Sequence, residues 1–215
     1  MNKSLTEIIF IIDKSGSMHH LVDDTIGGFN SFVEEQKEED GEARLTTVLF
    51  SSSRQKLYDG LDICEVPQMD RKQYFASGTT AMLDAIGETI DEVQHRIDNT
   101  PEEERPAHIL CVITTDGMEN ASHTYSKTQI QNMIEHQTKG HGWEFIFLGA
   151  NMDAVHEASA LGISQNNAAT YIPDSIGTTT LYSAVSTATK SVRNTGAVTT
   201  GWCDSVKVYT DSKLS

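Results

Sequence analysis

Short apolar runs alternate with stretches of helical periodicity along the chain. The run EIIFIID (7–13) is continuous rather than alternating, which is typical of a strand buried on both faces of a sheet. HILCVITTD (108–116) and WEFIFLGA (143–150) have the same character. Two further runs are separated by a polar turn that suits an antiparallel hairpin, and AATYIP predicts a short edge strand. The predicted strands are residues 7–13, 43–52, 57–66, 108–116, 143–150 and 168–173.

Between these runs, apolar residues return every three or four positions, which predicts amphipathic helices. Leu83, Ile86 and Ile90 begin a series that keeps this spacing for four turns. Ser126 and Gln129 have the spacing of a capping box at the start of another helix. Further helices are predicted around residues 26–33, 130–134, 152–162 (ended by Gly162) and 181–192.

Strand–helix alternation with continuous apolar strands predicts a parallel sheet covered by helices on both faces. We therefore expect a three-layer α/β/α fold, doubly wound around a mostly parallel six-stranded sheet with one antiparallel edge strand. A length of 215 residues suits one well-buried domain, which we place at residues 1–203. Residues 204–215 are predicted to be a tail that either adds a strand or forms a loose terminus.

Oxygen-bearing side chains gather where the predicted strands end. Asp13 and Asp116 each follow a buried strand directly, so both are expected at the carboxyl rim of the sheet, where α/β proteins bind ligands. Three segments supply such side chains: DKSGS (13–17), SGTTAMLDA (77–85) and TTDGMEN (114–120).

The residues alone leave several interpretations of these segments open. DKSGS supplies one carboxylate and two hydroxyls that suit a metal or an activated nucleophile, and its serines also suit a helix cap. Asp116 before Gly117 has the usual composition of a turn. Thr79 is a candidate helix cap, with Thr80 then inside the first turn.

Taken together, the three segments resemble the metal-ion-dependent adhesion site (MIDAS) of von Willebrand factor A (VWA) domains. The pattern of that site is Asp-x-Ser-x-Ser, a distant Thr and a distant Asp, and the resemblance spans residues 5–195 in the right element order. TAMLDA matches the family's threonine before a helix, which selects Thr80 over Thr79, and Asp116 stands in the family's TDG position. The resemblance implies five metal ligands: Asp13, Ser15, Ser17, Thr80 and Asp116.

The implied ligands are all oxygen donors, which suits Mg2+, with Mn2+ or Ca2+ as alternatives. Three of the five are neutral hydroxyls, so the site carries at most two negative charges and leaves the cation attractive to a further acidic ligand. In the family that ligand is a Glu or Asp side chain of a partner protein. The resemblance thus implies metal-dependent protein binding without catalysis.

Two alternative functions would place their site at the same rim. One is a metal-dependent phosphoryl-transfer or hydrolytic enzyme, and the other is a purely structural metal in a subunit of a larger assembly. The chain has neither a Gly-x-Gly-x-x-Gly nor a Gly-x-x-x-x-Gly-Lys-Ser/Thr motif. SGSMHH places a serine near histidines but lacks the nucleophile elbow Gly-x-Ser-x-Gly, and Lys14 is expected to point away from the site.

Other polar residues fall near the predicted rim. His19 and His20 lack the helical spacing of zinc ligands and are interpreted as exposed loop residues on the partner-binding side. Asn151 and Asp153 follow the strand 143–150 at the same rim, where loop solvation and a role in the recognition face both remain open.

Composition indicates which classes of partner and which cellular compartment are expected. There are 31 acidic and 16 basic residues, giving a net charge of −15, which argues against nucleic acid as a partner. Cys64, Cys111 and Cys203 are odd in number and widely spaced, so a disulfide framework is not expected and the first two are interpreted as core residues. No apolar run has the length of a signal h-region or a membrane span, which favours a cytoplasmic protein.

Overall fold

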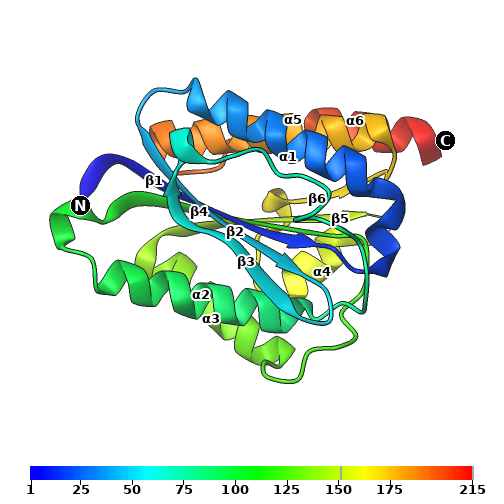
Figure 1. Ribbon diagram of the computed structural model, residues 1–215, viewed down its shortest axis with the longest axis horizontal. Helices are drawn as coiled ribbons and strands as arrows, with labels where there is room; N and C mark the ends of the chain where they lie inside the picture. The colour runs from blue at the N-terminus through cyan, green and yellow to red at the C-terminus, as the bar shows by residue number, and fades with distance from the viewer. Residues whose placement is uncertain (151, 215) are drawn as a thin grey trace.

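A twisted six-stranded sheet runs through the centre of the computed structural model, which describes residues 1–150 and 152–214 (Figure 1). The strand order is β3-β2-β1-β4-β5-β6, and every neighbouring pair is parallel except β2 with β3. The predicted hairpin and edge strands are thereby confirmed. The strands are β1 (Asn2–Asp13), β2 (Glu42–Phe50), β3 (Arg54–Asp62), β4 (Pro106–Thr115), β5 (Trp143–Ala150) and β6 (Ala168–Tyr171).

Helices cover both faces of this sheet (Figure 1). One face packs against α1, α5 and α6, and the other against α2, α3 and α4. The predicted three-layer α/β/α architecture is confirmed. The helices are α1 (Val22–Lys37), α2 (Met82–Asp98), α3 (Lys127–His141), α4 (Ala154–Ala160), α5 (Ser175–Thr195) and α6 (Asp204–Leu214).

The central strand β1 explains why its apolar run is continuous. Phe10 faces α1, where its ring meets those of Phe29 and Phe32 at centroid distances of 5.7 and 4.9 Å. Ile9 and Ile11 face the opposite layer, within the cluster that includes α2 and α3. Because both faces of β1 are buried there, residues 8–12 are all apolar, and the strand ends at Asp13.

Local signals fix the ends of some helices as predicted. Ser126 and Gln129 form the capping box of α3, and Gln129 accepts a hydrogen bond from the Ser126 backbone N–H at 2.9 Å. Gly162 follows α4 in the left-handed region, with φ +81°, a conformation that favours glycine.

Two sequence-based interpretations are wrong. The C-terminal tail is the helix α6, neither a strand nor a loose terminus. Its Val206 side chain is buried in the core. Thr210 Oγ1 donates a hydrogen bond to the Thr170 carbonyl, and the Tyr209 hydroxyl donates one to Asp174. These partners are distant in sequence, so no local pattern reveals the helix. Cys64 is exposed in a 3-10 turn after β3 and is not a core residue, whereas Cys111 is buried.

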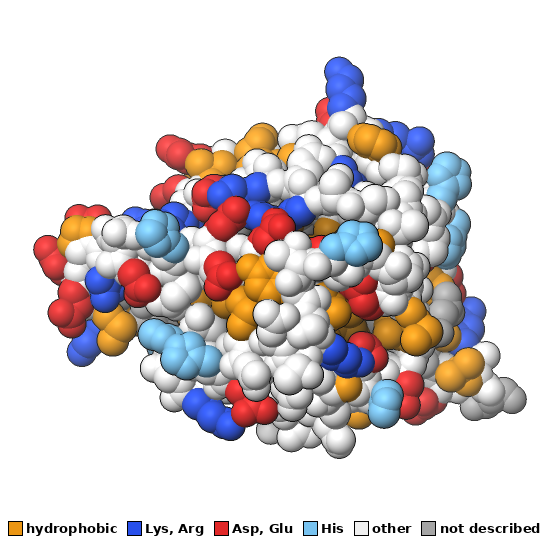
Figure 2. Space-filling view, turned by 90° about the horizontal axis from the view of Figure 1, so that it is seen from below, with side chains coloured by type: hydrophobic (Ala, Val, Ile, Leu, Met, Phe, Trp, Pro, Cys, Tyr) orange, Lys and Arg blue, Asp and Glu red, His pale blue; other side chains and the backbone are white. Residues whose placement is uncertain are grey.

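On the face seen in Figure 2, which lies on the α2 and α3 side, acidic and basic side chains are interspersed. Within the described residues, no helix combines the length and the apolar character that crossing a membrane would require.

Candidate metal centre

The carboxyl ends of β1 and β4 bring Asp13 and Asp116 to one rim. The two strands are parallel neighbours, with Ile12 opposite Thr114, so the residues that follow them emerge side by side. Thr115 Oγ1 donates to Asp13 Oδ2 at 2.7 Å, and the Ser15 backbone N–H donates to Asp13 Oδ1 at 2.6 Å. Both oxygens of the buried Asp13 carboxylate are thus held by hydrogen bonds.

A chain of hydroxyls joins these two strand ends. Ser15 Oγ lies 3.1 Å from Ser17 Oγ, and Ser17 Oγ donates to Asp116 Oδ1 at 2.5 Å. Ser15 is buried and Ser17 is exposed, while Met18 beside them is buried and anchors the turn. The first segment therefore reaches the third through its own side chains.

Gly117 shows that Thr80 belongs to the same cluster. A β-carbon at Gly117 would lie 3.2 Å from Thr80 Oγ1 and 3.6 Å from Ser17 Oγ, so both hydroxyls face this glycine. Thr79 is engaged elsewhere, because its hydroxyl donates to Ser52 Oγ at 2.9 Å. The structure thus brings together all five predicted residues and separates Thr79 from them.

Asn120 holds Thr80 in place, a role that sequence reasoning missed. Asn120 Oδ1 accepts a hydrogen bond from the Thr80 backbone N–H at 2.9 Å, and the Asn120 backbone N–H donates to the Thr80 carbonyl at 3.1 Å. The only sequence signal is its position four residues after Asp116, in a polar loop of no distinctive pattern.

Two further carboxylates fasten the loop after β4 to the start of α2. Glu119 accepts hydrogen bonds from the backbone of Leu83 and from Ser122, and Asp84 accepts three from backbone N–H groups of residues 123–125. Although burial opposes ionisation, these donors lower the pKa of both Glu119 and Asp84. The carboxylates stay ionised at neutral pH and keep the loop that carries Asp116 against the helix that follows Thr80.

The segment before α2 forms hydrogen bonds with the backbone of the segment that carries Asp13 and Ser15. The buried Tyr74 hydroxyl donates to the Asp13 carbonyl at 2.7 Å, and the Gly16 N–H donates to the Gly78 carbonyl at 3.0 Å. Lys14 turns away from the two aspartates, as predicted, because its Nζ donates to Gln55 Oε1 at 2.7 Å and lies 4.9 Å from the centre of the Phe75 ring.

The charge of the cluster fits a divalent cation. Among the described residues, neither Asp13 nor Asp116 forms an ion pair with a lysine, arginine or histidine. Burial raises the pKa of Asp13 in spite of hydrogen bonds from Thr115 and Ser15, and the nearby Asp116 charge adds to the effect. Two carboxylates and three hydroxyls are oxygen ligands of the kind that Mg2+, Mn2+ and Ca2+ take, so the residues present suit such an ion.

His19, His20, Asn151 and Asp153 are also predicted from the sequence to lie near the rim. His19 and His20 are exposed, and His20 Nδ1 lies 2.9 Å from the Ser17 carbonyl oxygen. Asp153 caps α4 by accepting a hydrogen bond from the His156 N–H at 2.9 Å. Asn151 lies outside the described residues.

The two neighbouring threonines allow a matched test of the predicted ligands. We expect Thr80→Ala to weaken Mn2+ or Mg2+ binding on the order of tenfold, because it removes an oxygen from the cluster, and Thr79→Ala to leave binding unchanged. Isothermal titration of both variants measures this. The opposite ranking would mean that the assignment of the threonine is one residue out of register.

Without metal, the buried Asp13 charge should cost stability. A group whose pKa is higher in the folded than in the unfolded state destabilises the fold at neutral pH, and this cost disappears as the pH falls through the folded pKa. We therefore expect Asp13→Asn to be more stable than the wild type in chelator at pH 7, with the difference shrinking toward pH 4. Urea unfolding at several pH values checks this; a variant that is less stable at pH 7 would contradict it.

Comparisons with known proteins identify the fold. No protein-family model matches the sequence, and no curated protein matches it either. Proximal thread matrix protein 1 from the mussel byssus, solved with a zinc-occupied MIDAS motif, has a TM-score of 0.59 at 17% identity over 86% of this chain and 46% of its own. A von Willebrand factor type A protein from Catenulispora acidiphila has a TM-score of 0.59 at 16% identity, over 87% of this chain and 43% of its own.

A third solved structure, the manganese-loaded TRAP protein of Plasmodium vivax, has a TM-score of 0.57 at 18% identity, over 80% of this chain and 70% of its own. This chain spans less than half the length of the mussel and Catenulispora chains. The shared architecture shows that the chain has the von Willebrand factor A fold, in agreement with the resemblance of its three rim segments.

Proposed function

We propose that this chain is a protein-binding VWA domain that holds a divalent cation, Mg2+ in the first place, at the carboxyl rim of its sheet. The observation that carries the proposal is the convergence of two carboxylates without ion-pair partners and three hydroxyls at one point of the described structure. Its proposed ligands are Asp13, Ser15, Ser17, Thr80 and Asp116. The zinc in the mussel protein and the manganese in the TRAP protein support a divalent ion on this fold.

The proposed ligands divide into fixed and accessible groups. Asp13, Ser15 and Thr80 are buried, and hydrogen bonds to their backbone or side-chain atoms fix their positions. These three residues are therefore already arranged on the buried side of the proposed site. Ser17 is exposed and Asp116 is half-buried, and these two lie on the solvent side. When bound, the cation would supply a Lewis acid that accepts a carboxylate oxygen from a Glu or Asp side chain of a partner protein.

The proposed activity is binding without turnover, in the cytoplasm, with neither nucleic acid nor a membrane as partner. The net charge of −15 supports the exclusion of nucleic acid. The three cysteines are free thiols in the structure, which is consistent with a reducing compartment.

Water-proton relaxation of the Mn2+-loaded chain tests the proposed site directly. Glutarate serves as the carboxylate probe, and we expect it to displace water from the bound Mn2+ and lower the relaxation enhancement. Asp116→Asn should lose most of the Mn2+ binding, whereas Asp153→Asn, the same change at a helix cap on the same rim, should keep it.

Two outcomes would count against the proposal. Equal Mn2+ binding by the wild type and Asp116→Asn would remove the rim site from the account. Turnover of a phosphate ester or a peptide by the wild type that is lost in Asp116→Asn would favour the enzyme alternative.

A further inference from the structure

Exposed apolar side chains are concentrated at the metal-binding rim. Six large apolar side chains are exposed among the described residues, and three of them, Phe75, Met118 and Ile176, lie at the carboxyl end of the sheet. Met118 comes two residues after Asp116, and Ile176 is in the first turn of α5. Phe75 lies under the Lys14 ammonium. Apolar side chains that gather at one end of a protein indicate an interaction surface, whereas single scattered ones are ordinary. The rim therefore offers a partner apolar contacts in addition to a cation.

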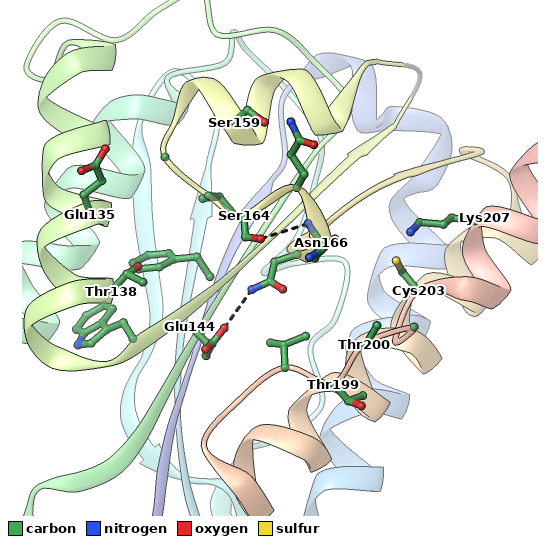
Figure 3. A pocket seen from close by; sticks show the side chains of 18 of the residues that line it. Glu135, Thr138, Glu144, Ser159, Ser164, Asn166, Thr199, Thr200, Cys203 and Lys207 are labelled. Atoms are coloured by element: carbon green, nitrogen blue, oxygen red, sulfur yellow. Dashed lines mark hydrogen bonds between the residues drawn. The ribbon is translucent and has the colours of Figure 1, made fainter.

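Phe75 borders a pocket of about 500 Å3 at this rim. Side chains from residues 19–24 and 71–76 line the pocket, and they include the exposed ring of His20 and the buried ring of Tyr74. A larger cleft of about 840 Å3 lies at the amino end of β5. Most of the side chains labelled there carry hydroxyl, amide or charged groups (Figure 3). The rim pocket, with its several rings, is therefore the better place for an apolar side chain.

Two hydrogen bonds place the rim pocket directly beside the metal centre. His20 Nδ1 lies 2.9 Å from the Ser17 carbonyl oxygen. Because a carbonyl oxygen only accepts, this nitrogen is the donor and the bond holds the ring in one orientation. The Tyr74 hydroxyl donates to the Asp13 carbonyl at 2.7 Å. A side chain close in sequence to a residue that binds the cation can therefore reach the pocket.

The charges around the rim pocket balance, so the pocket suits a neutral side chain. Arg71 forms an ion pair with Asp23, and its Nε donates to Asp23 Oδ1 at 2.7 Å. The second carboxylate of the pocket, Asp24, is matched in number by the Lys14 ammonium, which lies 4.9 Å from the centre of the Phe75 ring. A basic side chain would meet these two cations, and an acidic one would meet the two carboxylates.

We propose that the rim pocket binds an aromatic side chain of the partner segment, close in sequence to the acidic residue whose carboxylate reaches the cation. An aromatic ring buries a large apolar area and packs favourably against the rings of His20 and Phe75. Met118, with its flexible side chain, supplies a further apolar contact on the same rim.

The rim pocket gives the proposed metal site its selectivity, and this inference rests on that site. A cation with an open position accepts a carboxylate from any acidic segment, so the metal alone does not distinguish one acidic partner from another. The pocket adds a second requirement at a fixed distance from the cation. The chain would then select acidic residues by their aromatic neighbours.

Short peptides in a Gly-Ser background provide the probe. Each carries one Glu and one Trp, and the Trp is moved from three positions before the Glu to three positions after it. Titration into the Mn2+-loaded full chain, followed by Mn2+-induced broadening of the peptide NMR lines, measures the affinity. At one spacing or more, we expect the Trp peptide to bind about tenfold more tightly than the same peptide with Ser, because the pocket buries the ring. Chelator should abolish the binding of every peptide.

Two serine substitutions of exposed apolar residues form the matched pair. Phe75→Ser should remove the advantage of the Trp peptide, and it should still bind Mn2+ and glutarate because it removes no oxygen ligand. Val208→Ser, on α6, should keep the advantage. Phe75 is 53% exposed and Val208 is 70% exposed, so both variants should fold, and their melting temperatures check this.

Several results would overturn the pocket and leave the metal site standing. These are equal affinity for the Trp and Ser peptides at every spacing, a Trp advantage that survives Phe75→Ser, and a larger gain with Arg than with Trp. Loss of the Trp advantage in Lys207→Ser would place the ring in the larger cleft of Figure 3 and would also overturn it. Failure of the wild type to bind Mn2+ without any peptide would instead remove the metal site and this inference together.

Discussion

Saturating Mg2+ should stabilise the wild-type chain against unfolding by about 2.7 kcal/mol when its concentration is a hundredfold above the Kd. The reason is that the folded rim presents two carboxylates with no ion-pair partner among the described residues, and the unfolded chain has no such cluster. For a chain of this length the change corresponds to an increase in Tm of roughly 5–10 °C. Differential scanning calorimetry with Mg2+ and with chelator measures it.

The control uses two substitutions with the same change of charge. Asp13→Asn removes the buried carboxylate at the centre of the cluster and should melt at the same temperature with Mg2+ and with chelator. Asp153→Asn, on the same rim but at the cap of α4, should respond to Mg2+ as the wild type does. Identical melts of the wild type in Mg2+ and in chelator would exclude a functional ion at this rim.

Partner binding at the rim should tolerate salt and depend on metal. A chain of net charge −15 repels an acidic partner at long range, and salt weakens this repulsion as the Debye length falls from about 30 Å at 0.01 M to about 8 Å at 0.15 M. A carboxylate bound directly to a cation is affected much less. We therefore expect the complex to persist or strengthen with moderate salt and to disappear with chelator.

The measurement is capture of a partner on the immobilised chain across a series of salt concentrations, with Mg2+ or Mn2+ and with chelator. Asp116→Ala should reduce binding at least a hundredfold, on the order of the loss expected when a charged ligand leaves a metal site. A complex that dissolves in salt and survives chelator would instead be an ordinary charge patch. It would then have no connection with the metal centre.

The fold was predictable because its signals are strong and local. The continuous run before Asp13 is apolar at every position because β1 is buried by helices on both faces, and this condition alone indicates a central strand. The capping box at Ser126 fixes the start of α3 in the same local way. Helix α6 was missed because Val206 and Val208 alternate with polar residues, a pattern that resembles a strand as much as a helix. In the structure only Val206 is buried, against elements distant in sequence, while Val208 is 70% exposed.

The proximity of Asp13 and Asp116 was predictable from sequence because the carboxyl ends of parallel strands converge, and the resemblance to the MIDAS pattern added Ser15, Ser17 and Thr80 to the predicted cluster. The residues that hold these side chains in place were not predictable from the sequence. Asn120 binds Thr80, and Glu119 and Asp84 join the loop after β4 to α2, through contacts that span about forty positions or fewer in sequence but follow no periodic pattern. Such contacts depend on the tertiary arrangement of the loops, which the sequence pattern does not specify.

The most direct test of the metal centre is an anomalous difference map from crystals of the full chain grown with Mn2+. We predict a peak at the carboxyl rim between the ends of β1 and β4, with oxygen ligands from the five proposed side chains either direct or through water. Ser15 and Ser17 should be in direct contact with the Mn2+ ion, at distances between the roughly 2.0–2.1 Å of Mg2+ and the roughly 2.3–2.6 Å of Ca2+. A well-ordered rim without a peak at a saturating Mn2+ concentration, or a peak whose ligands exclude Ser15, Ser17 and Asp116, would contradict the account.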